Sequence, residues 1–391
     1  MRNVPLAAVV AAALATAVPV HPVAAQLTRS ELVRLERNRV IAAANRALAE
    51  APVTITAYPA ARSTGGIHDY FSEGDYWWPD PKNPGGPYVR RDGESNPDNF
   101  VQHREALRRM SQLVPALVAA YTVTHDERYA RQAMAHLRAW FVDEGTRMNP
   151  NLLYAQAIHG VAPGRGIGII DTIHLVEVAQ AIMTLERMGY GRAETPAVKE
   201  WFRQYLTWMT THPYGIEERD NGNNHSISWA LQVAEFAKLV GDEPTLAMDR
   251  RFFREKLVPE QMAPDGSFPK ELARTKPYGY SLFTLDVLGM TAQVLSTPRE
   301  NLWTWTTPDG RGMRRAVAWM YPFIQDRSKW PRQPDVMYFD AWPVRQPSLL
   351  FAGLAFPDPR YVALWKTLAP DPTVEEVIRN TPIRQPLLWV R

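Results

Sequence analysis

The sequence predicts an all-α protein. Apolar residues recur at helical spacing along most of the chain after residue 27, in roughly a dozen segments. Strand signals are scattered and weak, and no region alternates over several strands, so no terminal β-sandwich is expected. Loops of alternating short and long length fit sequential antiparallel helix pairs arranged in a ring, which is an α/α toroid. Periodicity alone does not distinguish a closed toroid from an open solenoid.

The N-terminus has the features of a secretory signal peptide over residues 1–25. Arg2 supplies a positive charge, the run from Leu6 to Val20 is apolar and rich in alanine, and Val23-Ala24-Ala25 offers a small-residue cleavage site. The run is short for a membrane span. We therefore expect export to a periplasm or to the outside, with no membrane association after cleavage. An uncleaved anchor is the alternative. Residues 26–391 are then a single α/α-toroid domain.

Composition narrows the classes of function. The chain has no cysteine, which excludes disulfides and thiolate metal sites. Its formal net charge is +3 and no concentrated basic stripe is present, so nucleic acid is not an expected partner. The 13 Trp and 15 Tyr suit sugar rings, although many of these side chains are expected to fill the core. The oligomeric state is not indicated by the sequence.

Helix boundaries follow from capping signals. Thr28 to Glu31 is expected to cap the first helix, Asp171 a later one, and Thr195-Pro196 places proline at the first position of another. The expected helices cover approximately residues 28–49, 98–122, 127–143, 171–188, 195–211, 225–240, 243–257, 281–295, 312–325, 346–355 and 360–368.

Two stretches lack a helical period. Residues 51–99 are dense in proline and glycine but also in aromatic residues, which argues for an ordered irregular segment that lines a cleft. Residues 149–168 form the second stretch and include Gly164-Arg165-Gly166-Ile167-Gly168. This run has no preceding strand and lacks the spacing of a phosphate loop. We interpret it as a tight turn in which glycine allows positive φ.

A polar cluster stands at the start of the helix expected over residues 225–240. Its members are Asn221, Asn223, Asn224, His225 and Ser226. One asparagine is expected to cap the helix, and capping alone is the simplest interpretation. A cap needs only one residue, however, and a helix N-terminus favours an anion through its free N–H groups and its dipole. The cluster therefore predicts a carboxylate-binding site built from neutral donors.

Arg274 and Tyr280 lie where a loop interrupted by glycine and proline leads into a helix. A free tyrosine has a pKa of about 10 and is a poor base at neutral pH. A nearby cation lowers such a pKa, and Arg274 is the natural candidate. The alternative is that Tyr280 is a core aromatic residue and Arg274 a surface charge.

Two other kinds of site compete with this interpretation. His225 could bind a metal, but the remaining histidines of the mature chain show no HxxxH or HxH spacing, so neither a metal nor a cofactor is expected. A glycoside hydrolase would need a pair of carboxylates. No spacing singles out a pair among the candidates, which are Asp69, Asp75, Asp80, Glu271 and Asp340.

Several motifs together resemble the alginate lyase superfamily of polysaccharide lyases. The resemblance covers about residues 65–300 and is carried by Asp75-Tyr76-Trp77-Trp78-Pro79-Asp80-Pro81, Arg90-Arg91-Asp92-Gly93, Asn223-Asn224-His225, Glu271-Leu272-Ala273-Arg274-Thr275 and Tyr280-Ser281. It implies an α/α toroid and β-elimination on polyuronates without a metal. By the same resemblance, Asn224 and His225 neutralise the uronate carboxylate, Tyr280 is the acid/base, and Arg274 assists the tyrosinate.

The chain departs from the mannuronate lyases in two places. The loop between Arg274 and Tyr280 differs in composition, and the Tyr-Trp-Trp-Pro-Asp-Pro segment looks more like the glucuronan-lyase branch. The expected substrate is therefore a β-1,4-linked acidic polysaccharide, either mannuronan (alginate) or glucuronan. Alternatives are a glycoside hydrolase on a similar toroid and a non-catalytic periplasmic uronate-binding protein. Expected substrate contacts are Asn223, Tyr76, Trp77, Trp78 and Gln156, with Arg90 and Arg91 for neighbouring carboxylates.

Overall fold

The computed structural model describes residues 27–390, so the predicted signal peptide lies outside the described residues. The helices are α1 (Arg29–Ala47), α2 (Gln102–Thr124), α3 (Glu127–Phe141), α4 (Leu175–Arg187), α5 (Thr195–Thr211), α6 (Pro213–Arg219), α7 (Asn224–Val240), α8 (Glu243–Phe252), α9 (Val258–Gln261), α10 (Pro269–Leu272), α11 (Pro277–Leu295), α12 (Met313–Gln325), α13 (Pro347–Ala355), α14 (Pro359–Thr367), α15 (Glu375–Arg379) and α16 (Pro386–Trp389). The 3₁₀ turns are η1 (Ile55–Ala57), η2 (Gly166–Thr172), η4 (Arg327–Lys329) and η5 (Phe339–Ala341), and a π-helical turn, η3 (Phe253–Leu257), extends α8.

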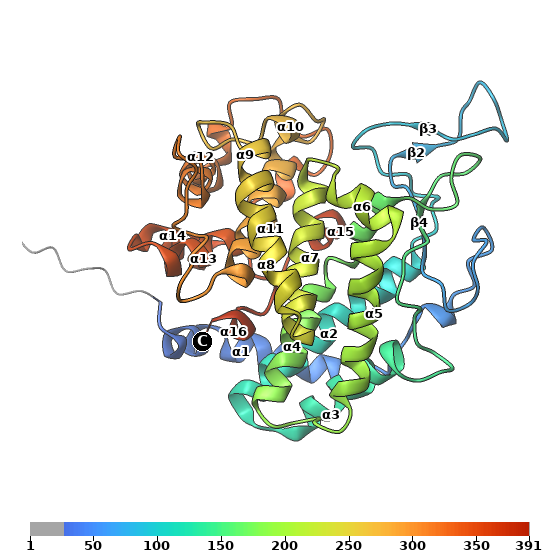
Figure 1. The fold of residues 1–391 in the computed structure, drawn as a ribbon, viewed down its shortest axis with the longest axis horizontal. Helices are drawn as coiled ribbons and strands as arrows, with labels where there is room; N and C mark the ends of the chain where they lie inside the picture. The colour runs from blue at the N-terminus through green and yellow to red at the C-terminus, as the bar shows by residue number, and fades with distance from the viewer. Residues whose placement is uncertain (1–26, 391) are drawn as a thin grey trace, which may run out of the picture.

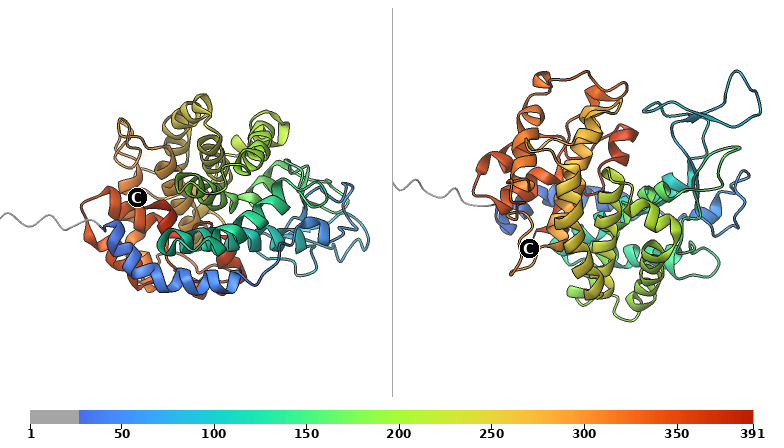
Figure 2. Two further views of the ribbon diagram at one scale, coloured as in Figure 1. Left: turned by 90° about the horizontal axis from the view of Figure 1, so that it is seen from below. Right: turned by 45° about the horizontal axis from the view of Figure 1, so that its top comes forward.

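The helices form an incomplete α/α toroid, which confirms the predicted fold class (Figure 1). An inner series α2, α4, α7, α11 and α13 packs each helix against the next, and the outer helices α1, α3, α5, α8, α12 and α14 cover them. The short α16 packs on α1, α2 and α4, so the C-terminal end lies beside the first helix (Figure 2). Nearly every residue of α7 and α11 is buried, as expected for helices that are apolar on all sides.

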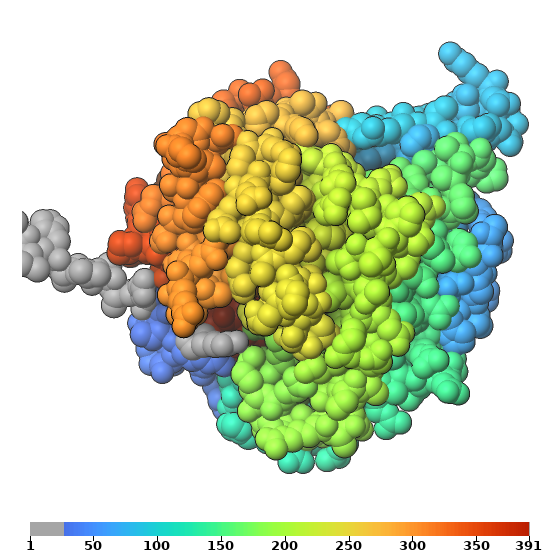
Figure 3. Space-filling view, viewed as in Figure 1, coloured from blue at the N-terminus to red at the C-terminus, as the bar shows by residue number. Residues whose placement is uncertain are grey.

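The strands are short and form no sandwich among the described residues. β1 (Phe71–Glu73) pairs in parallel with β4 (Tyr154–Ala157), and β2 (Trp77–Trp78) pairs antiparallel with β3 (Val89–Arg90). We call residues 74–96 the hairpin segment. Its base is held by Asn96, whose backbone N–H donates to Asp75 O at 2.8 Å. The segment projects from the upper right edge of the molecule in the space-filling view (Figure 3).

Inner helices α7 and α11 begin at the same end of the toroid. Asn224 starts α7 and Tyr280 lies in the first turn of α11, and both line one pocket. The positive ends of two helix dipoles therefore point towards this pocket, which favours a bound anion. No single helix in the described range is long and apolar enough to cross a membrane. The bent pair of η2 and α4 has the length and composition of a membrane span, but α4 is buried in the fold.

Most predicted caps are confirmed. Thr28 and Glu31 form a capping box at α1, and proline occupies the first turn of α5. The prediction that Asp171 caps a helix is wrong. Asp171 lies inside η2 and is 6% exposed, and its carboxylate accepts hydrogen bonds from Ser72 Oγ at 2.5 Å and Tyr70 Oη at 3.2 Å. A buried carboxylate without such partners is costly in free energy, so the Asp171 side chain bonds to these hydroxyl groups and does not cap a helix.

The interpretation of the Gly164–Gly168 run as a positive-φ turn is also wrong. None of its glycines has positive φ, and the run enters η2. The glycines are required by close packing instead. A Cβ on Gly164 would lie 2.0 Å from Leu153 O, and one on Gly168 would lie 2.4 Å from the Ala155 Cβ. The run is therefore pressed against β4, and this contact cannot be recognised from local sequence.

Candidate active site

A cavity of about 290 Å³ opens at the end of the toroid where α7 and α11 begin. It contains nine of the eleven side chains singled out from the sequence. The lining residues are Asp75, Tyr76, Trp77, Arg90, Gln156, Arg165, Ile167, Ile170, Asn221, Asn223, Asn224, His225, Arg274, Tyr280, Phe283, Arg379 and Asn380. Neutral donors, cations and aromatic rings thus surround one space.

The α7 side of the pocket is held by a cap and a buried carboxylate. Asn223 caps α7 by accepting from His225 N at 2.9 Å. Asn224 is 3% exposed and donates to the Glu271 carboxylate twice, from its backbone N at 2.9 Å and from Nδ2 at 2.7 Å. An amide nitrogen carries two hydrogens. The second hydrogen of the Asn224 Nδ2 group therefore remains for a ligand.

His225 lines the pocket and has one ring nitrogen fixed by the protein. Its Nδ1 lies 2.7 Å from Oε1 of Glu218, whose side chain is 0% exposed. Burial raises the pKa of Glu218, and the charge and hydrogen bond of His225 oppose that rise. Among the described residues Nε2 has no hydrogen-bond partner, and 18% of the side chain is exposed. Nε2 is thus available to a ligand.

The α11 side of the pocket centres on the Tyr280 hydroxyl. It lies 2.7 Å from the Tyr76 hydroxyl and accepts from Arg274 Nη2 at 3.2 Å. Arg274 is in turn fixed by Asp92, with Nε and Nη2 donating to the two carboxylate oxygens at 3.0 and 2.8 Å. Such a bidentate pair sets the direction of the guanidinium. Tyr76 and Asp92 both come from the hairpin segment.

The pKa of Tyr280 does not follow the prediction. Burial raises it well above its ordinary value, and the neighbouring Tyr76 adds to the rise, whereas the charge of Arg274 acts in the opposite direction without outweighing them. Arg274 therefore acts on the pKa of Tyr280 in the predicted direction, but the net pKa remains above that of a free tyrosine because burial and Tyr76 outweigh it. For Asp92, burial opposes ionisation, but the hydrogen bonds and charge of Arg274 hold its pKa at about 2.

In the hairpin segment, one tryptophan and one arginine line the pocket, and the tryptophan and arginine next to them in the sequence do not. Trp77 and Arg90 line the cavity, whereas Trp78 and Arg91 do not. Arg91 lies over the Trp78 ring, 4.8 Å from its centroid, and Trp78 Nε1 donates to Glu94 O at 3.0 Å. Successive strand residues point to opposite faces, so one residue of each pair is directed away from the pocket.

Gln156 and Arg165 form the wall next to β4. Gln156 has a φ of 50°, which is rare outside glycine, and its Nε2 donates to Asp171 Oδ1 at 3.1 Å. Arg165 donates from Nε to Gln156 O at 2.7 Å. No ion pair joins Arg165 to a carboxylate in the described part of the chain, and burial lowers its pKa to about 10. An unpaired, largely buried cation is suited to an anionic ligand.

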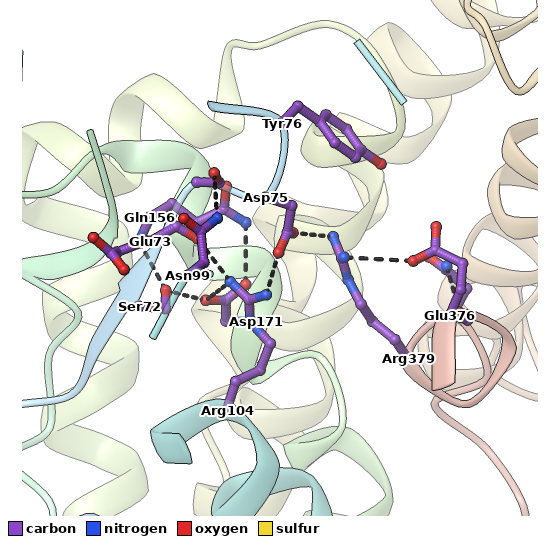
Figure 4. A network of polar contacts seen from close by, with 12 residues as sticks. Ser72, Glu73, Asp75, Tyr76, Asn99, Arg104, Gln156, Asp171, Glu376 and Arg379 are labelled. Carbon is purple, nitrogen blue, oxygen red and sulfur yellow. Dashed lines mark hydrogen bonds and ion pairs between the residues drawn. The ribbon is translucent and has the colours of Figure 1, made fainter. Parts of the chain in front are cut away.

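A buried charge network supports the floor of the pocket (Figure 4). Arg104 pairs with Asp75 and, at 3.4 Å, with Asp171. Arg379 of α15 pairs with Asp75 at 2.6 Å and with Glu376 at 3.5 Å. The network ties the base of the hairpin segment to a helix near the C-terminus, and it brings Arg379 and its neighbour Asn380 into the lining.

The sequence profile of the alginate lyases matches residues 54–330 of this chain. The chain belongs to the alginate lyase family. A solved alginate lyase from Bacteroides ovatus has 31% identity and a TM-score of 0.77, covering 90% of this chain and 93% of that one. Family membership makes the protein a polysaccharide lyase.

Two further structures share the fold. Alginate lyase A1-III from Sphingomonas species A1 has 15% identity and a TM-score of 0.53, covering 90% of this chain and 94% of that one. A variant of A1-III complexed with a tetrasaccharide gives a TM-score of 0.54 at the same identity and coverage. No curated protein sequence matches the chain.

The five carboxylates that could serve a glycoside hydrolase do not form a pair in the cavity. Asp69 accepts from Gly66 N at 2.8 Å and from Asn149 Nδ2 at 2.7 Å, and Glu271 holds Asn224. Asp340 is 93% exposed. Of the five candidates only Asp75 lines the cavity, and it is bound by two arginines. The described residues contain no group of three or more His, Asp or Glu side chains placed to hold a metal ion.

Several lining or supporting residues were missed from the sequence. Arg165 was assigned to a turn, and Arg379 and Asn380 lie about 100 residues after Tyr280 with no local signal. Glu218 was missed as the partner of His225, although its position seven residues earlier, before the polar cluster, was a possible signal. Asp92 belonged to a quoted motif, and its role as the partner of Arg274 became visible only in three dimensions.

Proposed function

We propose that this polysaccharide lyase cleaves a β-1,4-linked polyuronate, mannuronan (alginate) or glucuronan, by β-elimination. The observation that carries the proposal is the meeting of the Asn224 and His225 donors with the Arg274–Tyr280 pair in one pocket. The family supports the reaction class. The cationic and hydrogen-bonding lining supports an acidic sugar chain.

The donors on α7 stabilise the negative charge that develops during the reaction. The proton on C5 of a uronate lies α to a carboxylate, so its removal builds a second negative charge on that group. Donors from Asn224 Nδ2 and His225 Nε2, at the positive end of α7, are placed to offset this charge. Each preorganised donor of this kind typically contributes about 10²–10³ in rate.

Tyr280 then moves the proton. Its phenolate takes the C5 proton, the electron pair forms the C4–C5 double bond, and O4 leaves as the hydroxyl of the other fragment with the same proton. Base and acid are one residue on one face of the ring. Such acid–base action contributes perhaps 10²–10⁴ in rate. Because the pKa of Tyr280 is raised, the phenolate depends on Arg274, which donates to its oxygen at 3.2 Å.

The same residues serve mannuronate and glucuronate. These sugars share configuration at C4 and C5 and differ at C2, so one position of Tyr280 reaches the C5 proton of both. Guluronate is inverted at C5 and needs a base on the other face. Arg90, Arg165 and Arg379 line the cavity and are assigned to carboxylates of the bound chain.

We also propose that the protein is exported. The support is the signal-like segment of residues 1–25, with Arg2, its apolar run and a small-residue site before Gln26. Cell fractionation followed by N-terminal sequencing tests this. The expected result is a periplasmic or extracellular protein that begins near Gln26, and an intact N-terminus in the cytoplasm would contradict it.

A panel of purified polysaccharides tests the reaction and its substrate. Polymannuronate, polyguluronate, glucuronan and hyaluronan are incubated with the protein, and the unsaturated product is followed by ultraviolet absorbance. We expect a rise with polymannuronate or glucuronan and none with polyguluronate. New reducing ends without an absorbance rise would indicate a hydrolase. Binding without new ends would indicate a uronate-binding protein.

A further inference from the structure

Glu218 stands directly behind His225, on the side away from the cavity. It lies in the last turn of α6, whereas His225 lies in the first turn of α7. The Glu218 side chain is fully buried, with Oε1 2.7 Å from His225 Nδ1. A buried carboxylate without enough partners is costly in its charged form.

The number of protons on this pair decides what His225 offers to a ligand. The short contact requires one proton between Nδ1 and Oε1. If that were the only exchangeable proton of the pair, it would sit on Nδ1, and Nε2 would present a lone pair that repels a carboxylate. With one more proton, the pair is either a neutral carboxyl with Nε2–H imidazole or a carboxylate with imidazolium. In both forms Nε2 carries a hydrogen.

We propose that Glu218 is a positioning residue that shares a proton with His225 and keeps Nε2–H as a donor to the substrate carboxylate. This inference rests on the proposed elimination. As charge develops on the substrate carboxylate, the shared proton moves from Glu218 Oε1 to His225 Nδ1. The imidazole becomes an imidazolium without taking a proton from solvent. The positive charge on the imidazole forms only as negative charge develops on the substrate carboxylate, which favours the transition state over the bound substrate.

The surroundings of Glu218 leave His225 as its main partner. On α6 and just after it, the charge of Glu217 raises the pKa of Glu218, and a hydrogen bond from the Asn221 side chain lowers it less than His225 does. From α5, the Tyr205 hydroxyl is engaged with Thr172 at 2.7 Å. Asp171 of η2 is already bound to Ser72, Tyr70, Gln156 and Arg104. No lysine or arginine of residues 27–390 forms an ion pair with Glu218, and burial raises the pKa of Glu218, which agrees with a shared proton.

Glu218→Gln tests the inference, because it keeps the shape of the side chain and removes the acid. On the polyuronate that gives the largest absorbance rise, we expect kcat to fall about 30–300-fold while KM changes less than about threefold. Relative to the unchanged protein at the same pH, the variant should recover part of its rate as the pH falls towards 6, where an isolated histidine gains its proton. Glu217→Gln, which changes the exposed neighbouring carboxylate, is the matched control and should behave as the unchanged protein.

A second measurement needs no substrate. In protein labelled with ¹⁵N-histidine, we expect the chemical shift of His225 Nε2 to remain that of a protonated nitrogen from pH 6 to 8, with the resonance assigned by its absence in His225→Ala. A lone pair on Nε2 in the unchanged protein at pH 7 would overturn the inference.

The two measurements separate this inference from the proposed function. If no polysaccharide gives an unsaturated product while the ¹⁵N shifts are as expected, the proposed function fails and the proton-sharing pair stands. If elimination occurs but Glu218→Gln keeps its kcat and its pH profile, the elimination stands and the role of Glu218 is overturned.

Discussion

The two sides of the pocket are built in different ways. On the α7 side, Asn224 and His225 are held by Glu271 and Glu218, and all four belong to helices of the toroid or their ends. On the α11 side, Tyr280 and Arg274 depend on Tyr76 and Asp92, which lie about 180–200 residues earlier in the hairpin segment.

This difference indicates that the α7 side of the pocket is preformed, whereas the α11 side is completed by a separate segment of the chain. The α7 donors are set by helix packing and buried hydrogen bonds, so they persist whatever the hairpin segment does. The acid/base side is complete only when the hairpin segment lies against α11. Regions with few buried apolar contacts move more easily than core helices. Changes on the two sides should therefore have different signatures.

Removing a donor on the α7 side should have the largest effect of the changes considered next. For Asn224→Ala or His225→Ala we expect kcat/KM on the active polyuronate to fall about 10²–10³-fold, because one preorganised donor to the developing charge is lost. Initial rates of absorbance increase measure this. A loss below about fivefold for both variants would contradict carboxylate neutralisation by α7.

Asp92→Asn tests the α11 side. Asn accepts only one of the two hydrogen bonds from Arg274, so the guanidinium is less well directed at Tyr280 Oη. We expect kcat to fall about 10–100-fold because of this misplacement, with little change in melting temperature. Asp98→Asn, an exposed carboxylate just beyond the hairpin segment, is the control and should keep the full rate.

The pH dependence of the rate reports on Tyr280. Burial raises its pKa, so the phenolate fraction grows as the pH rises and is small below the pKa. We expect kcat to rise with pH above neutrality without levelling before about pH 10, the ordinary pKa of tyrosine. Rate profiles on a stable oligouronate measure this. A plateau that begins near pH 7 would show that the pKa of Tyr280 is lowered instead.

Trp77 and Trp78 form a matched pair on one strand. Trp77 lines the cavity and Trp78 does not. We expect Trp77→Ala to raise KM about tenfold, which corresponds to about 1.4 kcal/mol, through the loss of an aromatic surface next to the sugar, and Trp78→Ala to change it less than twofold. Equal effects of the two substitutions would contradict the orientation of the hairpin segment.

The smallest effect concerns the cap of α7. Asn223→Ala removes the acceptor of His225 N and should lower the free energy of unfolding by about 0.5–2 kcal/mol. Asn223→Ser keeps a capping oxygen and should retain most of that stability. Thermal and urea unfolding measure the difference. Equal stability of the two variants would mean that the cap contributes nothing here.

The fold was largely predictable because its signals are local. Helix periods and caps such as Thr28 and Asn223 depend on residues only three or four positions apart. The two errors in the fold concern contacts between distant segments. Asp171 has its carboxylate in a buried network with Ser72 and Tyr70, and Gly164 is pressed against Leu153 O. No local pattern encodes such contacts.

The site was predictable where chemistry-bearing residues cluster along the chain. Asn223, Asn224 and His225 are consecutive, and Arg274 and Tyr280 are six residues apart. Arg165, directly before η2, and Arg379 of α15 reach the same cavity. Their approach depends on packing over long sequence separations, so an arginine in either segment looks like an ordinary surface charge in the sequence.

One variant tests most directly whether the α7 side binds the substrate and the α11 side transfers the proton. In Tyr280→Phe the ring remains and the proton-transferring oxygen is lost, while Asn224 and His225 are untouched. By calorimetry we expect this variant to bind an oligomer of the active polyuronate with a Kd within about threefold of the unchanged protein, and to give no detectable rise in ultraviolet absorbance. Elimination at a rate within tenfold of the unchanged protein would contradict the assignment of Tyr280 as the acid/base.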